Sequence, residues 1–186
     1  MAVRKILLYP ADKAALRAPS APVERFDRAV KQLIKDLIDT LAAHPAGIGL
    51  AAPQINVQRR VVIVCLGAQP QSEIPSQPPI VLINPQILEA ASYQKDFDGC
   101  LSFPGLFGMT VRPHFLRVFG LNESGQPFTR TFKGFDAVVV HHELDHLDGV
   151  LFIDRIENPE DLYRIDLDEQ GHPVRVPLSQ FSDAPV

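Results

Sequence analysis

The sequence DAVVVHHELDHLDG, residues 136–149, decides the fold because it predicts a buried helix that also carries reactive side chains. Asp136 is suited to cap the N-terminus of a helix, and Gly149 stands where a left-handed residue ends one. Apolar residues fill the first turns, so we expect this helix to be buried on nearly every side and to lie at the centre of the domain.

His142 and His146 are four residues apart in this segment. Side chains at i and i+4 project from one face of a helix, so both imidazoles can bind one cation while Glu143 lies beside it. This arrangement suits water activated by a metal, with a carboxylate as the base. The same pattern also arises by chance in core helices, and a catalytic site of this kind needs a third protein ligand.

Three sources could supply the third ligand. The pattern H-x-x-x-H-x-x-G-x-x-H has its glycine at Gly149, but Phe152 stands where the third histidine is required. A glutamate from a later segment is a weaker alternative, because nothing in the sequence positions one; the candidates are Glu157, Glu160 and Glu169. Cys100 lies in the segment DGCLS, residues 98–102, outside any apolar strand, and its thiolate would complete a site of two histidines and one cysteine. Iron, zinc, nickel and cobalt ions all accept this donor set.

The rest of the chain predicts a scaffold of strands and one further helix. Apolar residues at spacings of three and four predict an amphipathic helix within 24–44, and β-branched residues predict a buried strand over 60–65, where Cys65 is a structural thiol. Residues 67–79 predict a surface loop, 80–83 a strand, and 115–121 with 127–132 a hairpin. Beyond Arg164 the sequence indicates no firm structure.

Composition narrows the class of protein further. The 186 residues contain 46% hydrophobic and 22% charged residues, typical of one globular domain. The net charge of -4 and the lack of a dense basic run argue against direct nucleic-acid binding, and no stretch has the length or hydrophobicity of a membrane span or signal peptide. Two cysteines cannot form a disulfide framework, so we expect a cytoplasmic protein.

Three separated motifs together resemble the peptide deformylase family. They are GIGLAAPQ at 47–54, GCLS at 99–102 and HELDHLDG at 142–149, flanked by ILLYP at 6–10 and VLFID at 150–154. The resemblance implies an α+β fold: a small single domain of antiparallel strands packed around the central metal-binding helix, with residues 1–165 as the catalytic domain and 166–186 as a tail without assigned structure. It also implies a metal-dependent hydrolase that removes the formyl group from the formylmethionine of nascent polypeptides.

The resemblance also implies a role for individual residues. Cys100, His142 and His146 would be the metal ligands, Glu143 the acid and base, and Gln54 with the Leu101 amide the donors to the oxyanion. The substrate would be bound by Gly47, Ile48, Gly49, Asp98, Gly99 and Val139. The implied metal is Fe(II), for which Zn, Ni or Co can substitute, and the implied partners are N-formylmethionyl peptides, including those still at the ribosome.

This sequence departs from the family pattern near the site. Asp98 stands where glutamate is usual, His141 where glutamine is usual, and a common basic residue is missing around Phe107. We expect any hydrogen bond by which the shorter Asp98 orders the substrate strand or the loop carrying Cys100 to be longer or mediated by water, giving a functional but slower enzyme; the alternative is that the neighbouring residues have readjusted. His141 should be a hydrogen-bond partner and not a ligand. Two rival functions are a small metallopeptidase with a carboxylate ligand and a catalytically weakened metal-binding homologue, and formate release separates them from a deformylase.

Overall fold

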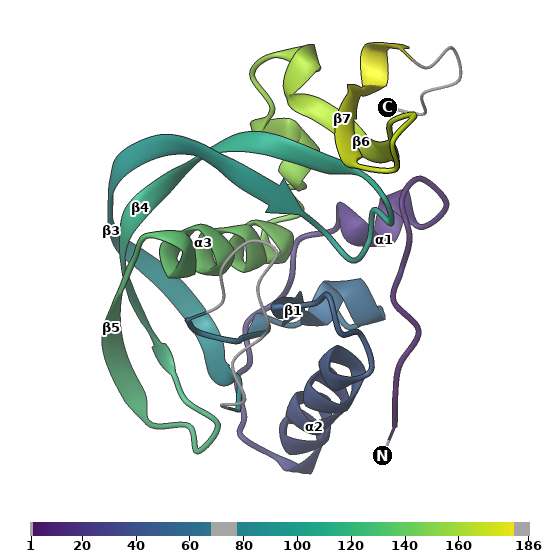
Figure 1. Cartoon of the computed structure of the whole chain (residues 1–186). Coiled ribbons are helices and arrows are strands. Elements are labelled where there is room, and N and C mark those ends of the chain that lie inside the picture. Colours follow the sequence, from purple (N-terminus) through teal and green to yellow (C-terminus); the bar gives the residue numbers. More distant parts are fainter. Residues whose placement is uncertain (1, 68–77, 181–186) are drawn as a thin grey trace.

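The computed structural model describes residues 2–67 and 78–180, which form one curled antiparallel sheet with helices inside and beside it (Figure 1). The sheet order is β1-β2-β3-β4-β6-β7, and β5 also pairs with β4. The strands are β1 (Gly49–Ala51), β2 (Val61–Val64), β3 (Ile80–Gly99), β4 (Phe107–Leu121), β5 (Pro127–Lys133), β6 (Leu162–Leu167) and β7 (Pro173–Pro177). The helices are α1 (Lys13–Leu16), α2 (Arg28–Ala42) and α3 (Phe135–Leu147), and the short 3₁₀ turns are η1 (Ala52–Ile55), η2 (Phe152–Arg155), η3 (Pro159–Asp161) and η4 (Leu178–Gln180).

The central helix predicted from the sequence is α3, which lies in the concave side of the sheet (Figure 1). All of its residues from Ala137 to Leu147 are buried, because β1, β2, β4 and β5 pack around it. Gly149 ends the segment with a φ of 70°, as predicted. The prediction that Asp136 caps the helix is wrong. The capping position is Gly134, and the Asp136 carboxylate instead accepts a hydrogen bond of 2.8 Å from the backbone N–H of Gly67.

The amphipathic helix predicted within 24–44 is α2, and Asp27 caps it by accepting hydrogen bonds from the N–H groups of Ala29 and Val30. Its apolar stripe packs on β1 and β2, in a core that also contains Cys65, the thiol predicted to be structural. A second core fills the space between α3 and the sheet. Most of the loop predicted over 67–79 lies outside the described residues.

The longest strands extend well beyond their predicted limits. Only residues 80–83 were predicted as strand, yet β3 continues to Gly99 and pairs with β4 along its length, with irregularities between Ile83 and Gln86 and between Ile87 and Glu89. Most of the later β3 residues are exposed or half-buried and polar, so the hydrophobic pattern of a strand is weak there. The extension matters for the site, because it places Cys100 directly at the end of a long, paired strand.

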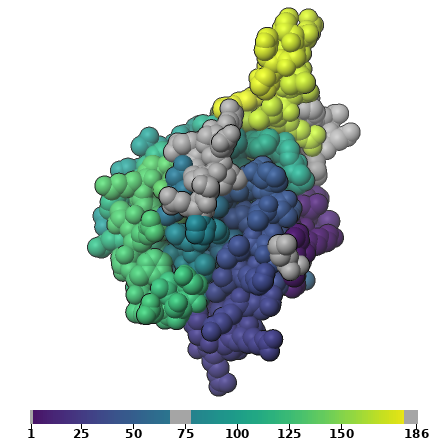
Figure 2. Space-filling model, turned by 60° about the horizontal axis from the view of Figure 1, so that its bottom comes forward, coloured from purple at the N-terminus to yellow at the C-terminus, as the bar shows by residue number. Residues whose placement is uncertain are grey.

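The C-terminal segment, to which the sequence assigned no structure, forms a hairpin. Strands β6 and β7 pair with each other, and β6 joins the sheet through the pairs Phe107↔Tyr163 and Gly108↔Leu162. The hairpin stands out from the rest of the molecule (Figure 2). None of the described helices is long and apolar enough to cross a membrane.

Candidate active site

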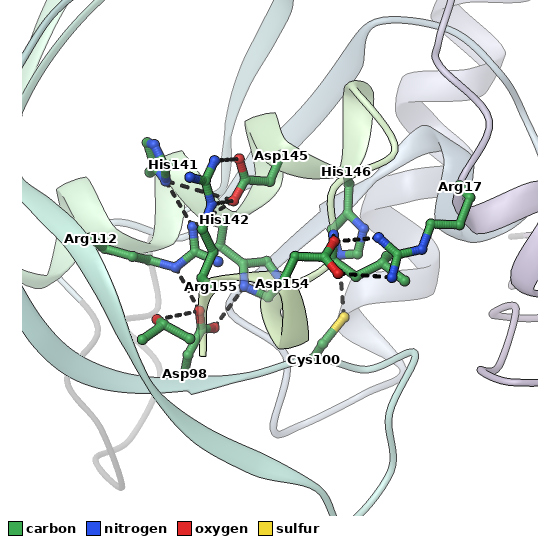
Figure 3. Close-up of polar contacts among 12 residues, drawn as sticks. Arg17, Asp98, Cys100, Arg112, His141, His142, Asp145, His146, Asp154 and Arg155 are labelled. Carbon is green, nitrogen blue, oxygen red and sulfur yellow. Dashed lines mark hydrogen bonds and ion pairs between the residues drawn. The ribbon is translucent and has the colours of Figure 1, made fainter. Parts of the chain in front are cut away.

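The three predicted metal ligands converge between β3 and α3. Cys100 follows β3 directly, while His142 and His146 project from the same face of α3 (Figure 3). Their potential ligand atoms all lie within 4.8 Å of one another, and Cys100 Sγ is 3.2 Å from His146 Nε2. Across the described parts of the chain, no other cluster of this kind occurs, and the later glutamates do not join this one. The structure therefore brings together the cysteine alternative and not the glutamate alternative.

The donor set fits a divalent transition metal. One thiol and two imidazoles are ligands that such ions accept, and both histidines are buried. Nδ1 of His142 is already engaged by Asp98 at 2.7 Å, which leaves Nε2 as its ligand atom. Beside this group, Glu143 Oε2 is buried without a hydrogen-bond partner. A polar atom buried in this way is costly unless a bound species completes its contacts, so the pocket is built for an occupant.

Asp98 is a buried carboxylate with three direct hydrogen-bond partners. It is 4% exposed, and its oxygens accept direct hydrogen bonds from His142 Nδ1 (2.7 Å), Arg112 Nε (2.6 Å) and Thr110 Oγ1 (2.8 Å). None of these three bonds goes to the loop that carries Cys100 or to a substrate, so the expectation for those contacts stays a prediction. Burial alone raises the pKa of Asp98, but its interactions with His142 and with the Arg112 guanidinium more than offset this and hold that pKa well below its usual range.

Arg112 explains why the shorter acid is accommodated. Its side chain is fully buried on β4, between β3 and α3, and it donates to Asp98, to Asp145 Oδ2 (2.8 Å) and to His141 Nδ1 (2.7 Å) (Figure 3). Because a guanidinium only donates, Nδ1 of His141 must accept, so His141 is the tautomer protonated at Nε2. Burial lowers the pKa of His141 to about 4 despite the nearby Asp145 carboxylate. His141 is thus a hydrogen-bond partner of Arg112 and lies outside the ligand group, as predicted.

Lengthening Asp98 is expected to harm this site. In an Asp98→Glu variant, the extra methylene pushes the carboxylate toward Arg112 and His142, which it contacts directly, at an overpacking cost of about 1–3 kcal/mol. A displacement of His142 on the order of 1 Å should lower kcat/KM by about tenfold to a hundredfold. Thermal unfolding and formate-release kinetics of the wild type and the variant would measure both effects. A faster variant would restore the original expectation that the shorter acid limits the rate.

A double variant tests whether His141 and Asp98 are adjusted to each other. Both side chains contact Arg112, so Asp98→Glu and His141→Gln should not be additive, with a coupling of about 0.5 kcal/mol or more in unfolding free energy. Additive effects would show that the two departures from the family pattern are independent.

Glu143 is positioned as a buried acid or base next to the ligand group. It is 5% exposed, and burial raises its pKa to about 7, which places the carboxyl group where it can both accept and donate a proton near neutral pH. The β1 backbone passes directly over it: a Cβ added to Gly49 would overlap Oε1 of Glu143. A glycine is therefore required at position 49 for this carboxyl group to fit.

Gln54 presents its amide N–H to the site. It lies in η1, where its Oε1 accepts a hydrogen bond of 2.8 Å from the Ala51 N–H. This contact fixes the orientation of the amide, whose Nε2 lies 3.4 Å from Cys100 Sγ and 3.2 Å from Ser102 Oγ. Gln54 is therefore an oriented donor beside the ligand group, as an oxyanion donor must be.

The N-terminal segment holds the two loops that carry these groups. The Leu7 N–H donates to the Gln54 carbonyl (2.8 Å), and the Tyr9 N–H donates to the Ser102 carbonyl (2.9 Å). No local pattern in the sequence predicts these supports or a role for Thr110 or Arg112. Ser102 and Asp145 lie inside the GCLS and HELDHLDG motifs, but neither was assigned a role from the sequence alone.

A cavity of about 820 Å³ opens onto this site, and most of its lining is apolar. Every residue predicted to bind substrate lines it, namely Gly47, Ile48, Gly49, Asp98, Gly99 and Val139. Gln54, Cys100, Leu101, His142 and Glu143 also line it. Phe97 and Phe107 form an aromatic wall, with their ring centroids 5.6 Å apart. The cavity is thus suited to an extended, partly apolar ligand whose polar end reaches the ligand group.

The curled sheet and a buried helix with two histidines, a glutamate and a cysteine partner define the class: a metal-dependent hydrolase. Comparison with known proteins identifies the family. Residues 3–161 match the family model of polypeptide deformylase, and peptide deformylase 1 of Bacillus subtilis (strain 168) is 40% identical over 156 residues, covering 84% of this chain and 91% of that one. This chain belongs to the peptide deformylase family.

Solved structures agree with this assignment. The crystal structure of a peptide deformylase from Legionella pneumophila is 36% identical, with a TM-score of 0.74, and the match covers 84% of this chain and 87% of that chain. The peptide deformylase from Thermotoga maritima is 33% identical, with a TM-score of 0.75, over 85% of this chain and all of the other. The predicted α+β fold with antiparallel strands around a metal-binding helix is confirmed.

Proposed function

We propose that this protein removes the formyl group from the N-terminal formylmethionine of nascent polypeptides and releases formate. The observation that carries this proposal is the convergence of Cys100, His142 and His146 beside Glu143, in a chain that matches the deformylase family over residues 3–161. Hydrolysis of an amide requires a nucleophile made from water, a proton for the leaving amine, and donors to the carbonyl oxygen. In this chain, Glu143 can carry out the proton transfers, and Gln54 and the Leu101 N–H can donate to the carbonyl oxygen.

A divalent ion held by Cys100, His142 and His146 would act as a Lewis acid and make hydroxide available near neutral pH. Glu143 accepts the proton that the attacking water loses, and then donates it to the departing amine nitrogen, so no proton is left unaccounted for. The Gln54 amide and the backbone N–H of Leu101 donate to the formyl oxygen as negative charge develops on it. Each such donor contributes about 3 kcal/mol to lowering the barrier in comparable sites.

The buried charges keep this machinery in place. Asp98 holds His142 through Nδ1, and Arg112 holds Asp98 in turn, so the imidazole presents a fixed edge to the site. This support is the role we assign to Asp98, together with its place on the cavity lining.

The substrate is a peptide lying in the cavity. A structure of a class I type b peptide deformylase from Acinetobacter baumannii with Met-Ala-Ser bound is 33% identical to this chain, with a TM-score of 0.75. We assign the same class of ligand here. Gly47, Ile48 and Gly49 allow close approach of a peptide backbone, and Gly99 and Val139 also line the cavity.

Fe(II) is the metal we propose, with Zn, Ni or Co as substitutes, since all accept imidazole together with thiolate. We further propose that the protein acts in the cytoplasm on formylated chains as they leave the ribosome.

One assay tests the function. Freshly purified protein of measured metal content is mixed with formyl-Met-Ala-Ser, and formate and free amine are followed separately. A deformylase releases both in equal amounts and leaves the Met-Ala bond intact. Cleavage of that bond would indicate a metallopeptidase, and metal binding without formate release would indicate a catalytically weakened homologue.

A further inference from the structure

The C-terminal hairpin lies beyond residues 3–161, the part of the chain that matches the family model, yet it touches the wall of the cavity. Its first strand, β6, pairs with the start of β4 and sets Tyr163 opposite Phe107. Tyr163 is only 2% exposed, although the hairpin that carries it stands out from the molecule (Figure 2). A buried aromatic residue in a projecting hairpin has a packing partner that keeps it in place.

The packing partner of Tyr163 is Phe107, which belongs to a continuous stack of aromatic rings. Tyr163 packs against Phe107 with centroids 6.4 Å apart, and Phe107 packs against Phe97 at 5.6 Å. On the other side of Tyr163, the Arg175 guanidinium of β7 lies 4.8 Å from its ring centroid. Such aromatic and cation–π contacts favour particular ring orientations, so the stack constrains each ring in it.

A second set of contacts anchors the outer end of the stack. The Tyr163 hydroxyl and the Arg175 guanidinium both approach the Met109 sulfur, at 4.0 Å and 3.6 Å. At the inner end, a Cβ on Gly99 would lie 3.0 Å from Cδ1 of Phe107, so the Phe107 ring rests on the backbone next to Cys100. The hairpin therefore reaches the Phe97–Phe107 part of the cavity lining through the Phe107 ring.

We propose that the C-terminal hairpin is part of the substrate-binding apparatus, in which Tyr163, held between Arg175 and Phe107, positions the Phe97–Phe107 wall against an apolar part of the peptide. Tyr163 does not reach the cavity lining itself and is a positioning residue. This inference rests on the proposed function for the identity of the peptide. According to this inference, the hairpin increases the affinity for the peptide and takes no part in the proton transfers, which Glu143 carries out.

The test compares Tyr163→Leu, which loses the ring, with Tyr163→Phe, which keeps it. Calorimetry measures Kd for Met-Ala-Ser, formate release from formyl-Met-Ala-Ser gives KM and kcat, and metal content and thermal unfolding are recorded for each protein. Tyr163→Leu should raise Kd and KM by about three- to tenfold and leave kcat within about twofold. Tyr163→Phe should remain within about twofold of wild type on every measure.

Leu167→Ala is the matched control, since Leu167 lies on the same strand and is 65% exposed. It should leave Kd and KM unchanged. The proposal is overturned if a folded, metal-loaded Tyr163→Leu protein keeps the wild-type Kd and KM, if Tyr163→Phe is as impaired as Tyr163→Leu, or if the loss is in kcat.

If the Tyr163→Leu protein does not fold, the Arg175→Ala variant tests the proposal instead. Removing the guanidinium should raise Kd and KM by about three- to fivefold, and values within about twofold of wild type would overturn the proposal. Because Kd is measured without turnover, a wild-type protein that releases no formate would refute the proposed function, while the comparison of Kd values still tests the hairpin.

Discussion

Glu143→Gln is expected to retain one metal per chain and to lose at least about a thousandfold in kcat/KM, since glutamine cannot accept a proton from water or return one to the amine. The two side chains have nearly the same shape, so the variant should fit under the Gly49 backbone and fold normally. Metal analysis and formate-release kinetics on the same sample provide the measurement.

Metal content and activity together distinguish a base from a metal ligand. Loss of the metal in this variant would mean that Glu143 is itself a ligand, and the proton transfers assigned to it would be wrong. Retention of both metal and full activity would mean that another group acts as the base.

Cys100→Ala should abolish tight metal binding and reduce formate release to less than about one-thousandth of the wild-type rate, because two imidazoles remain where three protein ligands are needed. Cys65→Ala is its matched control: Cys65 is the only other cysteine, and it lies in the core beside α2, away from the ligand group. That control should keep its metal and most of its activity. One metal per chain in the Cys100→Ala protein would contradict the ligand assignment.

The central helix and the ligand group could be predicted because their signals are local. The spacing of His142 and His146 can be seen in the sequence, and the apolar residues before them predict that the helix is buried. Cys100 could be predicted as the third ligand by eliminating the alternatives and by the family resemblance. The position of Cys100 in space could not be predicted, because it depends on β3, whose later half is polar and has little hydrophobic pattern.

The buried charges could not have been predicted in this way. Arg112 lies in a strand segment between a valine and a proline, and nothing local distinguishes it from an exposed arginine. Its partners Asp98, His141 and Asp145 come from β3 and α3, so the network exists only after these elements have packed. The same reason applies to Asp98, whose bond to Arg112 depends on how β3 and β4 pair.

The C-terminal hairpin was missed for another reason. Its prolines and many polar residues are typical of a tail, and its pairing partner, the start of β4, is distant in the sequence. Strand pairing with remote residues leaves little trace in a local window.

The backbone bonds from Leu7 to Gln54 and from Tyr9 to Ser102 also bear on the order in which the molecule gains activity during synthesis. They join Leu7 and Tyr9 to loops that are synthesised later, and α3, with both histidines, is synthesised later still. Contacts between residues so distant in sequence form late in folding, because the chain must first lose the entropy of the intervening loops. A ribosome-bound fragment that ends before α3 therefore has Leu7, Tyr9, its amide donor and its thiol but lacks both histidines, and each new molecule becomes an enzyme only after α3 has been synthesised.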